Sequence, residues 1–167
     1  MNTLPVPLGS GELRLWRLDH QRYAGTWASG AGSFRVGGRW SSKGLPVVYC
    51  AIDPAVAILE VAVHKGFEVL DTEPHVLTSA RVDAAMLYVV DAKALPNANW
   101  LRPGVPSAGQ QLHGSRLLRA HDGILVPSVV SQHSWNLVFE ARLGGLPLDD
   151  IQQEPFALDP RLHPPAS

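Results

Sequence analysis

The sequence has very little cysteine and almost no excess of charge of either sign. Cys50 is its only cysteine, so no disulfide can form within the chain and no cysteine cluster can bind a metal. We therefore expect an interior held by packing alone, which suits a reducing cytosol. Lys and Arg number 14 against 15 Asp and Glu, a net charge of −1. No overall basic field would attract nucleic acid or an anionic membrane, so binding there would need a local basic patch.

Long apolar runs are also missing. Nowhere do about 18 apolar residues follow one another, the length needed to cross a bilayer. The first residues, MNTLPVPLGSGELR, lack the basic start and apolar stretch of a secretory signal. These absences predict a soluble, cytoplasmic protein that contacts neither membrane nor nucleic acid directly.

The chain is nevertheless long and apolar enough to bury a core. It has 167 residues, of which 46% are hydrophobic and 17% charged, and this predicts one folded domain. We expect a lead-in over residues 1–12, the domain itself over 13–155 and a C-terminal tail over 156–167. No internal repeat is visible.

Hydrophobic periodicity and turn residues predict an α+β fold, a single domain with a mixed β core and a few helices. Apolar and polar residues alternate over 13–18, which predicts a strand with Arg14 and Arg17 on opposite faces. Asp53 and Pro54 open the clearest helix, which Gly66 ends. Further strands are expected at 46–51, 76–81, 86–90, 123–127 and 137–139, and a second helix at 110–120. A long loop or a poorly regular hairpin is expected at 25–44, and a proline-rich connection at 91–108.

Several common catalytic motifs are absent. The segment 30–35 begins like a dinucleotide fingerprint but lacks its third glycine and follows no strand that leads into a helix. The sequence has no Walker loop, no HExxH helix and no GxSxG elbow that would make Ser128 and His133 part of a hydrolase triad. We therefore expect no metal site and no Rossmann-type hydride transfer.

Glu60 is the acidic residue most in need of explanation. It lies in a helix made mostly of Ala, Val, Ile and Leu, and a desolvated carboxylate must be paired or hydrogen-bonded. A buried Glu60 therefore predicts a cationic or donor partner, for which Arg17 and Arg39 are the candidates. Alternatively, Glu60 lies at the solvent edge of its helix beside His64.

Arg39 follows two glycines, which allow the backbone to come close to a ligand. Its planar guanidinium suits bidentate contact with phosphate oxygens, and Arg17 could supply a second such contact. The alternative is an ordinary hairpin turn with an exposed Arg39 and a packed Trp40. Ser128, just beyond a short apolar strand, is placed either to reach into a cleft or to satisfy turn backbone after a proline.

These segments together resemble the RES domain family, which is named for an arginine, a glutamate and a serine. The resemblance runs from about Arg14 to Phe139. The matching segments are LWR at 15–17, GGRWS at 37–41, VYCA at 48–51, AILE at 57–60, VPS at 126–128 and NLV at 136–138. It departs from the family at Ser41 and Ser42, where an asparagine is common, and at Glu140.

The resemblance implies the toxin of a bacterial toxin–antitoxin pair, similar in fold to ADP-ribosylating toxins, that consumes NAD by hydrolysis, phosphorolysis or ADP-ribosyl transfer. It implies a cognate antitoxin, commonly with an Xre-like DNA-binding part, and leaves water, phosphate or a protein as the acceptor. The implied roles are a catalytic carboxylate for Glu60, NAD-binding arginines at 17 and 39, an aromatic beside the nicotinamide ribose at Tyr49, the family's serine at Ser128 and a supporting asparagine at Asn136.

These residue types suit the chemistry. Breaking the nicotinamide–ribose bond develops positive charge on the ribose, which a fixed carboxylate stabilises in the transition state. Two arginines can neutralise the pyrophosphate and so orient the ribose, and Tyr49 can stack on nicotinamide or ribose. NAD is then a substrate, and no metal is required. Two other classes remain open: a non-catalytic module that binds NAD or ADP-ribose, and a structural protein whose glycine-rich loop packs on a partner.

Overall fold

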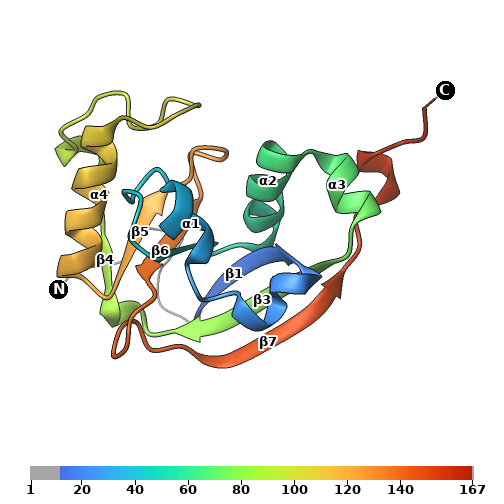
Figure 1. The fold of residues 1–167 in the computed structure, drawn as a ribbon, viewed down its shortest axis with the longest axis horizontal. Coiled ribbons are helices and arrows are strands. Elements are labelled where there is room, and N and C mark those ends of the chain that lie inside the picture. Colours follow the sequence, from blue (N-terminus) through green and yellow to red (C-terminus); the bar gives the residue numbers. More distant parts are fainter. Residues whose placement is uncertain (1–11, 167) are drawn as a thin grey trace.

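The computed structural model describes residues 12–166 and has one β-sheet at its centre (Figure 1). Within these residues, seven strands pair in the order β4-β5-β6-β2-β1-β3-β7. β4 and β5 are parallel and the other neighbours are antiparallel, so the sheet is mixed and the fold is α+β, as predicted. The strands are β1 (Leu13–His20), β2 (Val47–Ala51), β3 (His75–Val82), β4 (Leu87–Val89), β5 (Gly123–Pro127), β6 (Trp135–Glu140) and β7 (Asp149–Phe156).

Four α-helices and four short 3₁₀ turns accompany the sheet in the described part of the chain. In Figure 1, α2 and α4 stand on either side of α1, β5 and β6. No helix within residues 12–166 is both long enough and apolar enough to cross a membrane. The helices are α1 (Ala31–Val36), α2 (Pro54–Lys65), α3 (Phe67–Thr72) and α4 (Ala108–Ala120); the 3₁₀ turns are η1 (Gln21–Thr26), η2 (Ala84–Met86), η3 (Ala92–Ala94) and η4 (Pro160–Leu162).

The two long helices begin at side-chain caps. The carboxylate of Asp53 accepts hydrogen bonds from the first backbone amides of α2, and Gly66 ends this helix with φ 84°. Ser107 caps α4 by accepting from the amide of Gln110. Within α4, Gly114 lies directly against the backbone of Trp40, where a Cβ atom would clash. This close approach brings α4 next to the segment that carries Arg39.

Both faces of the sheet are buried in its central part. Alternate residues of β2 point to opposite sides, since Val48 packs in one apolar cluster with β1 and β3 while Val47 packs in another beneath α4. β1 follows the predicted alternation: Leu15 and Leu18 lie in different clusters. The predicted strand at 86–90 is shorter than expected, because Met86 belongs to η2.

Three elements differ from the expectation. The region 25–44, predicted as a loop, contains the end of η1 and all of α1, which are too short to show a helical period. α3 follows Gly66 directly and was not predicted. β7 was not predicted either, because its residues are exposed except for a half-buried Phe156 and so show no apolar alternation; it pairs with β3 through its backbone.

The ends of the chain relate differently to the predicted boundaries. Residues 1–11 of the predicted lead-in lie outside the described residues. In the segment predicted as a tail, Leu158 is buried with Leu70 of α3 and Leu77 of β3.

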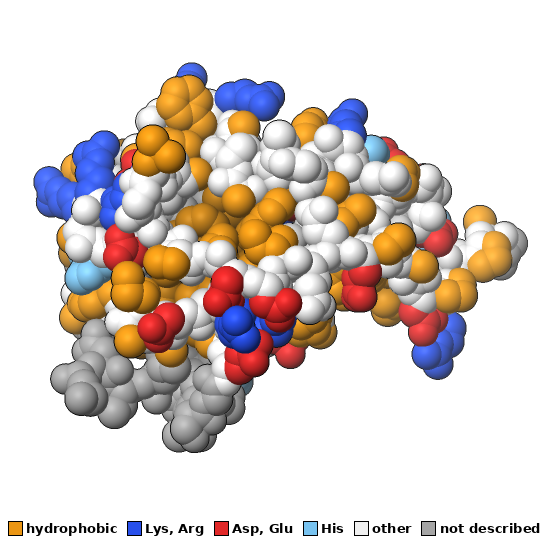
Figure 2. Space-filling model, turned by 90° about the horizontal axis from the view of Figure 1, so that it is seen from below, with side chains coloured by type: hydrophobic (Ala, Val, Ile, Leu, Met, Phe, Trp, Pro, Cys, Tyr) orange, Lys and Arg blue, Asp and Glu red, His pale blue; other side chains and the backbone are white. Residues whose placement is uncertain are grey.

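Seen from below in Figure 2, acidic and basic side chains gather next to exposed apolar surface. β7 is an edge strand, and its charged residues and Pro155 fit an edge that resists pairing with another chain.

Candidate functional site

The carboxylate of Glu60 is held by residues from two strands of the sheet. Its Oε1 accepts one hydrogen bond from the Ser128 hydroxyl at 3.1 Å and another from Asn136 Nδ2 at 2.8 Å. Ser128 follows β5, Asn136 lies in β6, and Glu60 lies in α2, so the fold brings together residues 68 and 76 positions apart. Among residues 12–166, no protein donor reaches Oε2, which leaves that oxygen available to another group.

The direct partners of Glu60 correct one expectation. A cationic or donor partner was predicted, with Arg17 and Arg39 as the candidates. Within the described chain the carboxylate has two donor partners, but they are neutral, and neither arginine forms an ion pair with it. The alternative that Glu60 points to solvent beside His64 is also wrong, because the half-buried carboxylate turns toward β5 and β6. Glu60 therefore keeps its negative charge oriented but not neutralised.

Ser128 combines the two roles that its sequence position suggested. It is completely buried, and its Oγ donates to Glu60 while accepting from the backbone amide of Ser131 at 3.2 Å. The same hydroxyl thus closes a turn and fixes the carboxylate. Asn136 Oδ1 is buried and has no protein partner in the described part of the chain. This oxygen, beside Glu60, is therefore available to accept a hydrogen bond.

Tyr49 lies in β2, beneath the glycine turn that carries Arg39. Its hydroxyl accepts from the amide of Trp40 at 3.0 Å and shares a hydrogen bond of 2.8 Å with Ser41 Oγ. Gly38 has no room for a Cβ because the Tyr49 ring occupies that space. Burial raises the pKa of the phenol, so Tyr49 is a neutral, firmly placed ring. Its predicted contact with nicotinamide or ribose stays a prediction.

Arg17 is already engaged on two sides. Its Nε donates to Asp19 Oδ2 at 2.9 Å and its Nη1 to the Tyr49 carbonyl at 2.8 Å. The bond to Asp19 lies within β1, and the bond to Tyr49 connects β1 to β2, two strands whose only paired residues in the described chain are Trp16 and Ala51. Arg17 therefore supports the position of Tyr49, and its predicted contact with a pyrophosphate remains to be tested.

Arg39 reaches from the glycine turn to the segment that precedes α4. Its Nη1 donates to the Trp100 carbonyl at 2.8 Å, and its Nη2 to the Gly104 carbonyl at 3.4 Å. Trp40 is buried at 2% exposure, whereas Arg39 is half-buried. The turn thus packs its tryptophan, as in the simpler alternative, but does not leave the arginine in free solvent.

Electrostatics connect Arg39 with the other site residues. Burial lowers the pKa of Arg39, and the negative charge of Glu60 acts in the opposite direction. An arginine stays protonated at any physiological pH even when its pKa falls. The site therefore presents a fixed cation and a fixed anion that are close enough to influence one another but are not bonded.

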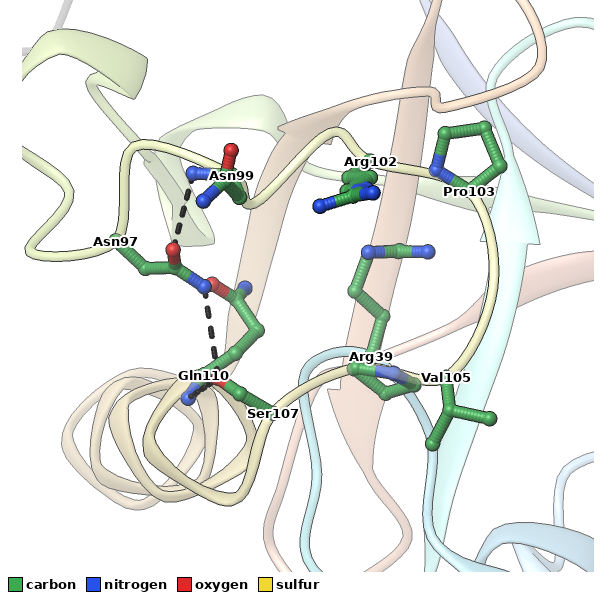
Figure 3. Close-up of a pocket in the computed structure, with 9 residues that line it drawn as sticks. Arg39, Asn97, Asn99, Arg102, Pro103, Val105, Ser107 and Gln110 are labelled. Atoms are coloured by element: carbon green, nitrogen blue, oxygen red, sulfur yellow. Dashed lines mark hydrogen bonds between the residues drawn. The ribbon is translucent and has the colours of Figure 1, made fainter.

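The structure adds residues that were not predicted as site residues. Arg39 lines a pocket of about 340 Å³ with polar residues from the connection 91–108 and from the start of α4 (Figure 3). Asn97, Arg102 and Gln110 are among the pocket's polar lining residues. A clue was present in the sequence, because long connections inside compact domains are often functional. Among residues 12–166, no three His, Cys, Asp or Glu side chains group as metal ligands would.

The fold and this arrangement of residues define an α+β domain with an oriented glutamate next to an arginine pocket. The family model of the RES domain matches residues 14–159. A protein named Toxin Res from Pseudomonas putida is 35% identical over 153 residues, covering 89% of this chain and 98% of its own length. This chain therefore belongs to the RES domain family, as its sequence motifs indicated.

Other relatives agree with this assignment. A Toxin Res from Photorhabdus laumondii is 31% identical and covers 89% of this chain and 96% of its own length. A Prs ADP-ribosylating toxin from a Sphingobium strain is 30% identical, over 74% of this chain and 79% of its own. Among solved structures, a chain of the M. tuberculosis MbcT–MbcA toxin–antitoxin complex has the same fold, with a TM-score of 0.69 at 20% identity, covering 88% of this chain and 85% of that one.

Proposed function

We propose that this protein is the toxin of a toxin–antitoxin pair and cleaves the nicotinamide–ribose bond of NAD. The proposal is supported most by one observation: Glu60, on a helix otherwise rich in apolar residues, has one carboxylate oxygen fixed by Ser128 and Asn136, and no cation from residues 12–166 pairs with it. The relatives named as Res toxins and as an ADP-ribosylating toxin support the same class.

The reaction needs a negative charge near the ribose. When the bond between ribose C1′ and the nicotinamide nitrogen breaks, its electron pair leaves with nicotinamide, and the ribose becomes an oxocarbenium ion. Glu60 stabilises this cation more than the ground state, because positive charge on the ring grows toward the transition state. Ser128 and Asn136 hold the carboxylate in place, so little reorganisation is needed during the reaction.

The other predicted site residues bind and orient NAD. Arg39 contacts the pyrophosphate. Arg17 contacts it through Nη2, the guanidinium nitrogen that forms no hydrogen bond within the described residues. Tyr49 packs beside the nicotinamide ribose. Fixing the pyrophosphate holds the ribose in one orientation relative to Glu60. Attack on C1′ by water, inorganic phosphate or a protein side chain then completes hydrolysis, phosphorolysis or ADP-ribosyl transfer.

Nicotinamide release tests this function. The purified protein is incubated with NAD in the presence of phosphate and of cell extract, and free nicotinamide is measured by chromatography. We expect Glu60→Gln to reduce the rate about 100- to 1000-fold, the usual effect of removing one preorganised electrostatic group. Glu68→Gln, on an exposed position of α3, removes the same charge and should leave the rate unchanged.

Two outcomes would contradict the proposal: no nicotinamide release by the wild-type protein, or equal release by Glu60→Gln. Calorimetry with NAD distinguishes the alternative of a non-catalytic NAD or ADP-ribose module, which would bind the ligand and release nothing. An interaction protein without nucleotide binding would give no heat with NAD, and Arg39→Ala would change nothing.

We further propose a cognate antitoxin, with an Xre-like DNA-binding part, as the protein's partner. The solved complex of similar fold contains a toxin and an antitoxin, and the chain's net charge of −1 gives it no general affinity for DNA. Co-expression with the neighbouring open reading frame should yield a complex that releases no nicotinamide. An uninhibited complex, or no complex, would count against this partner.

A further inference from the structure

The pocket beside Arg39 is separate from the contacts of Glu60 and has its own chemical character. It lies between the segment 97–107 and the first turn of α4. In Figure 3, the guanidinium groups of Arg39 and Arg102 lie next to each other on one side, and the amides of Asn97 and Gln110 lie close together on the other. The nine lining residues include no acidic side chain.

The two arginines have no anionic partner in the described part of the chain. Arg39 donates to the carbonyls of Trp100 and Gly104 only, and no hydrogen bond or ion pair of the Arg102 guanidinium is found within residues 12–166. Adjacent like charges repel one another, and partial burial makes this repulsion stronger because water screens it less. Burial also lowers the pKa of Arg39. An anion between the two guanidinium groups would remove this cost.

The opposite side of the pocket supplies unused donors. Gln110 is 2% exposed, and its Nε2 is buried without a partner. Such a group costs free energy unless a ligand satisfies it. Asn97 Nδ2 has only a long contact of 3.5 Å with Ser107 Oγ. Ser107 and Gln110 also place the pocket at the N-terminus of α4, a helix of 13 residues whose dipole favours an anion there.

We propose that this pocket binds a phosphate group, with Arg39 and Arg102 donating to its oxygens from one side and the Gln110 amide from the other. Guanidinium groups bind phosphate through paired hydrogen bonds, which a single charge such as a lysine cannot reproduce. The phosphate belongs either to the dinucleotide or to free inorganic phosphate. The proposal rests on the proposed function only in sharing Arg39 with it.

Binding measurements without turnover test the pocket. Calorimetry uses two probes, ADP-ribose and inorganic phosphate, with the wild type, Arg102→Gln, Arg102→Lys and Gln110→Leu. We expect Arg102→Gln to weaken binding of the relevant probe at least about tenfold, the usual effect of one charged hydrogen bond. Arg102→Lys should recover only part of the loss. Arg116→Gln, an exposed arginine of α4, is the matched control and should bind as the wild type does.

The two probes separate the two sources of phosphate. If the dinucleotide supplies it, ADP-ribose binding depends on Arg102, and inorganic phosphate competes with ADP-ribose. If free phosphate is the ligand, it binds the wild type together with ADP-ribose, and Arg102→Gln weakens phosphate alone. Equal affinity of both probes for wild type, Arg102→Gln and Gln110→Leu would overturn the proposal, as would an equal loss in Arg116→Gln.

The outcome is independent of the reaction. A wild-type protein that binds phosphate through Arg102 but releases no nicotinamide would refute the proposed function and support the pocket. A protein that releases nicotinamide while Arg102→Gln binds both probes normally would do the opposite. Arg102 is exposed, so its variants should fold, and circular dichroism of each variant checks this.

Discussion

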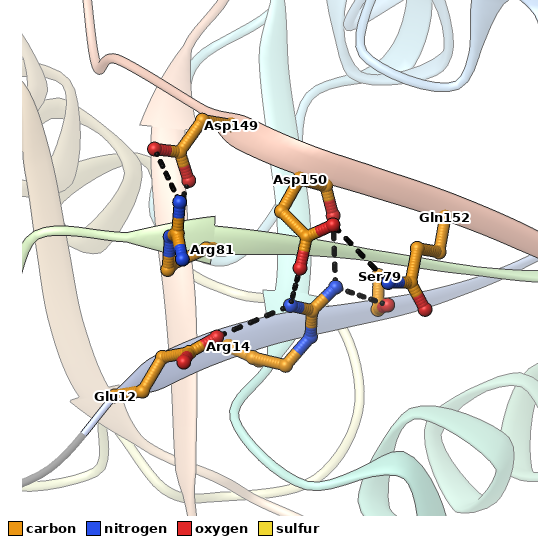
Figure 4. A network of polar contacts seen from close by, with 7 residues as sticks. All are labelled: Glu12, Arg14, Ser79, Arg81, Asp149, Asp150 and Gln152. Atoms are coloured by element: carbon orange, nitrogen blue, oxygen red, sulfur yellow. Dashed lines mark hydrogen bonds and ion pairs between the residues drawn. The ribbon is translucent and has the colours of Figure 1, made fainter.

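The arginines at the two ends of the sheet are in opposite situations. At the β1, β3 and β7 end, each arginine meets a carboxylate (Figure 4). Arg14 Nη1 lies 2.6 Å from Asp150 Oδ2, and Arg81 Nε lies 2.7 Å from Asp149 Oδ1. Near α4, Arg39 and Arg102 face each other, and no carboxylate of the described residues pairs with them. Charges at the first end serve the fold, and those at the second are available to a ligand.

This difference explains why net charge says little about binding in this protein. The chain as a whole is close to neutral, but its arginines are paired with carboxylates at the β1, β3 and β7 end of the sheet, and those of the pocket near α4 are not paired within the described chain. The network of Figure 4 brings β7 to β3 through side chains as well as backbone, and Arg14 also donates to Ser79 and to the Asp150 carbonyl. The pocket near α4 instead gathers hydrogen-bond donors, and none of its nine lining residues is acidic.

Substituting one arginine at each end should give the largest difference in kcat/KM. Arg39→Gln should lower kcat/KM for NAD about 100- to 1000-fold, because it removes a charged donor from a partly buried site. Arg81→Gln, which removes the same charge from the paired end, should leave kcat/KM unchanged. Nicotinamide release at several NAD concentrations measures both. Equal effects of the two substitutions would mean that the pairing of charges does not distinguish the two ends.

The packing of α4 on Trp40 should be the next most sensitive feature. Gly114→Ala places a methyl group against the backbone of Trp40, and we expect a loss of about 1–3 kcal/mol in the free energy of unfolding, as for other overpacked sites. The variant should also bind ADP-ribose more weakly, because α4 carries Gln110. Gly109→Ala in the same helix meets only Ser107 Oγ, at 3.9 Å. Urea unfolding of this control should show no loss; a loss like that of Gly114→Ala would contradict the packing argument.

The hydrophobic pattern of the sequence predicted the elements that bury one or both of their faces in the structure. β1, β2, β5 and both long helices have one or two buried faces, and their caps and glycines mark the ends. β7 could not be found in this way, because an edge strand with exposed side chains on both faces carries no hydrophobic signal. Its pairing with β3 depends on backbone hydrogen bonds and on polar side-chain contacts such as Arg81 with Asp149, and neither leaves a hydrophobic pattern in the sequence.

The candidate site divides along similar lines. Glu60 and Ser128 were identified together from motifs, and the structure joins them by a hydrogen bond. That Asn136 and Ser128, not an arginine, hold Glu60 could not be predicted, because it depends on β5 and β6 being neighbours. Arg102 and Gln110 were missed because they lie in a proline-rich connection and at a helix start, where no period shows which way a side chain points.

The paired end should respond to acid in a way that the pocket does not. Arg14→Met removes hydrogen bonds to Asp150 and Ser79, and at pH 7 we expect a small loss in the free energy of unfolding, because solvent screens this exposed ion pair. Arg14 holds the pKa of Asp150 below its ordinary value. Because the folded pKa is the lower one, this stabilisation is present above the ordinary aspartate pKa and is lost as pH falls through the folded pKa.

Urea unfolding of wild type and Arg14→Met at pH 7 and at pH 3 measures this effect. The difference between the two proteins should shrink at the lower pH. The same pair of measurements on Arg102→Gln should show almost no difference at either pH, since no carboxylate is paired with Arg102 in the described chain. A constant difference for Arg14→Met across this range would mean that Asp150 contributes nothing through its charge.

The last comparison concerns two neighbouring glutamines of α4. Gln111 Nε2 donates to the Gly38 carbonyl at 3.0 Å, whereas Gln110 Nε2 is buried without a partner. Gln111→Leu should therefore lower the free energy of unfolding by about 1 kcal/mol, the value of an ordinary hydrogen bond. Gln110→Leu removes an unsatisfied group and keeps the side chain's approximate size, so the unfolding free energy should stay the same or rise by less than about 1 kcal/mol.

Ligand should reverse the order of wild type and Gln110→Leu. A ligand that binds only the folded state stabilises it in proportion to the logarithm of its concentration over Kd. If the pocket takes a phosphate through the Gln110 amide, ADP-ribose or phosphate at saturation raises the Tm of the wild type more than that of Gln110→Leu. Thermal unfolding with and without each probe measures this. Equal shifts in Tm would show that the buried amide is a cost of the fold with no use in binding.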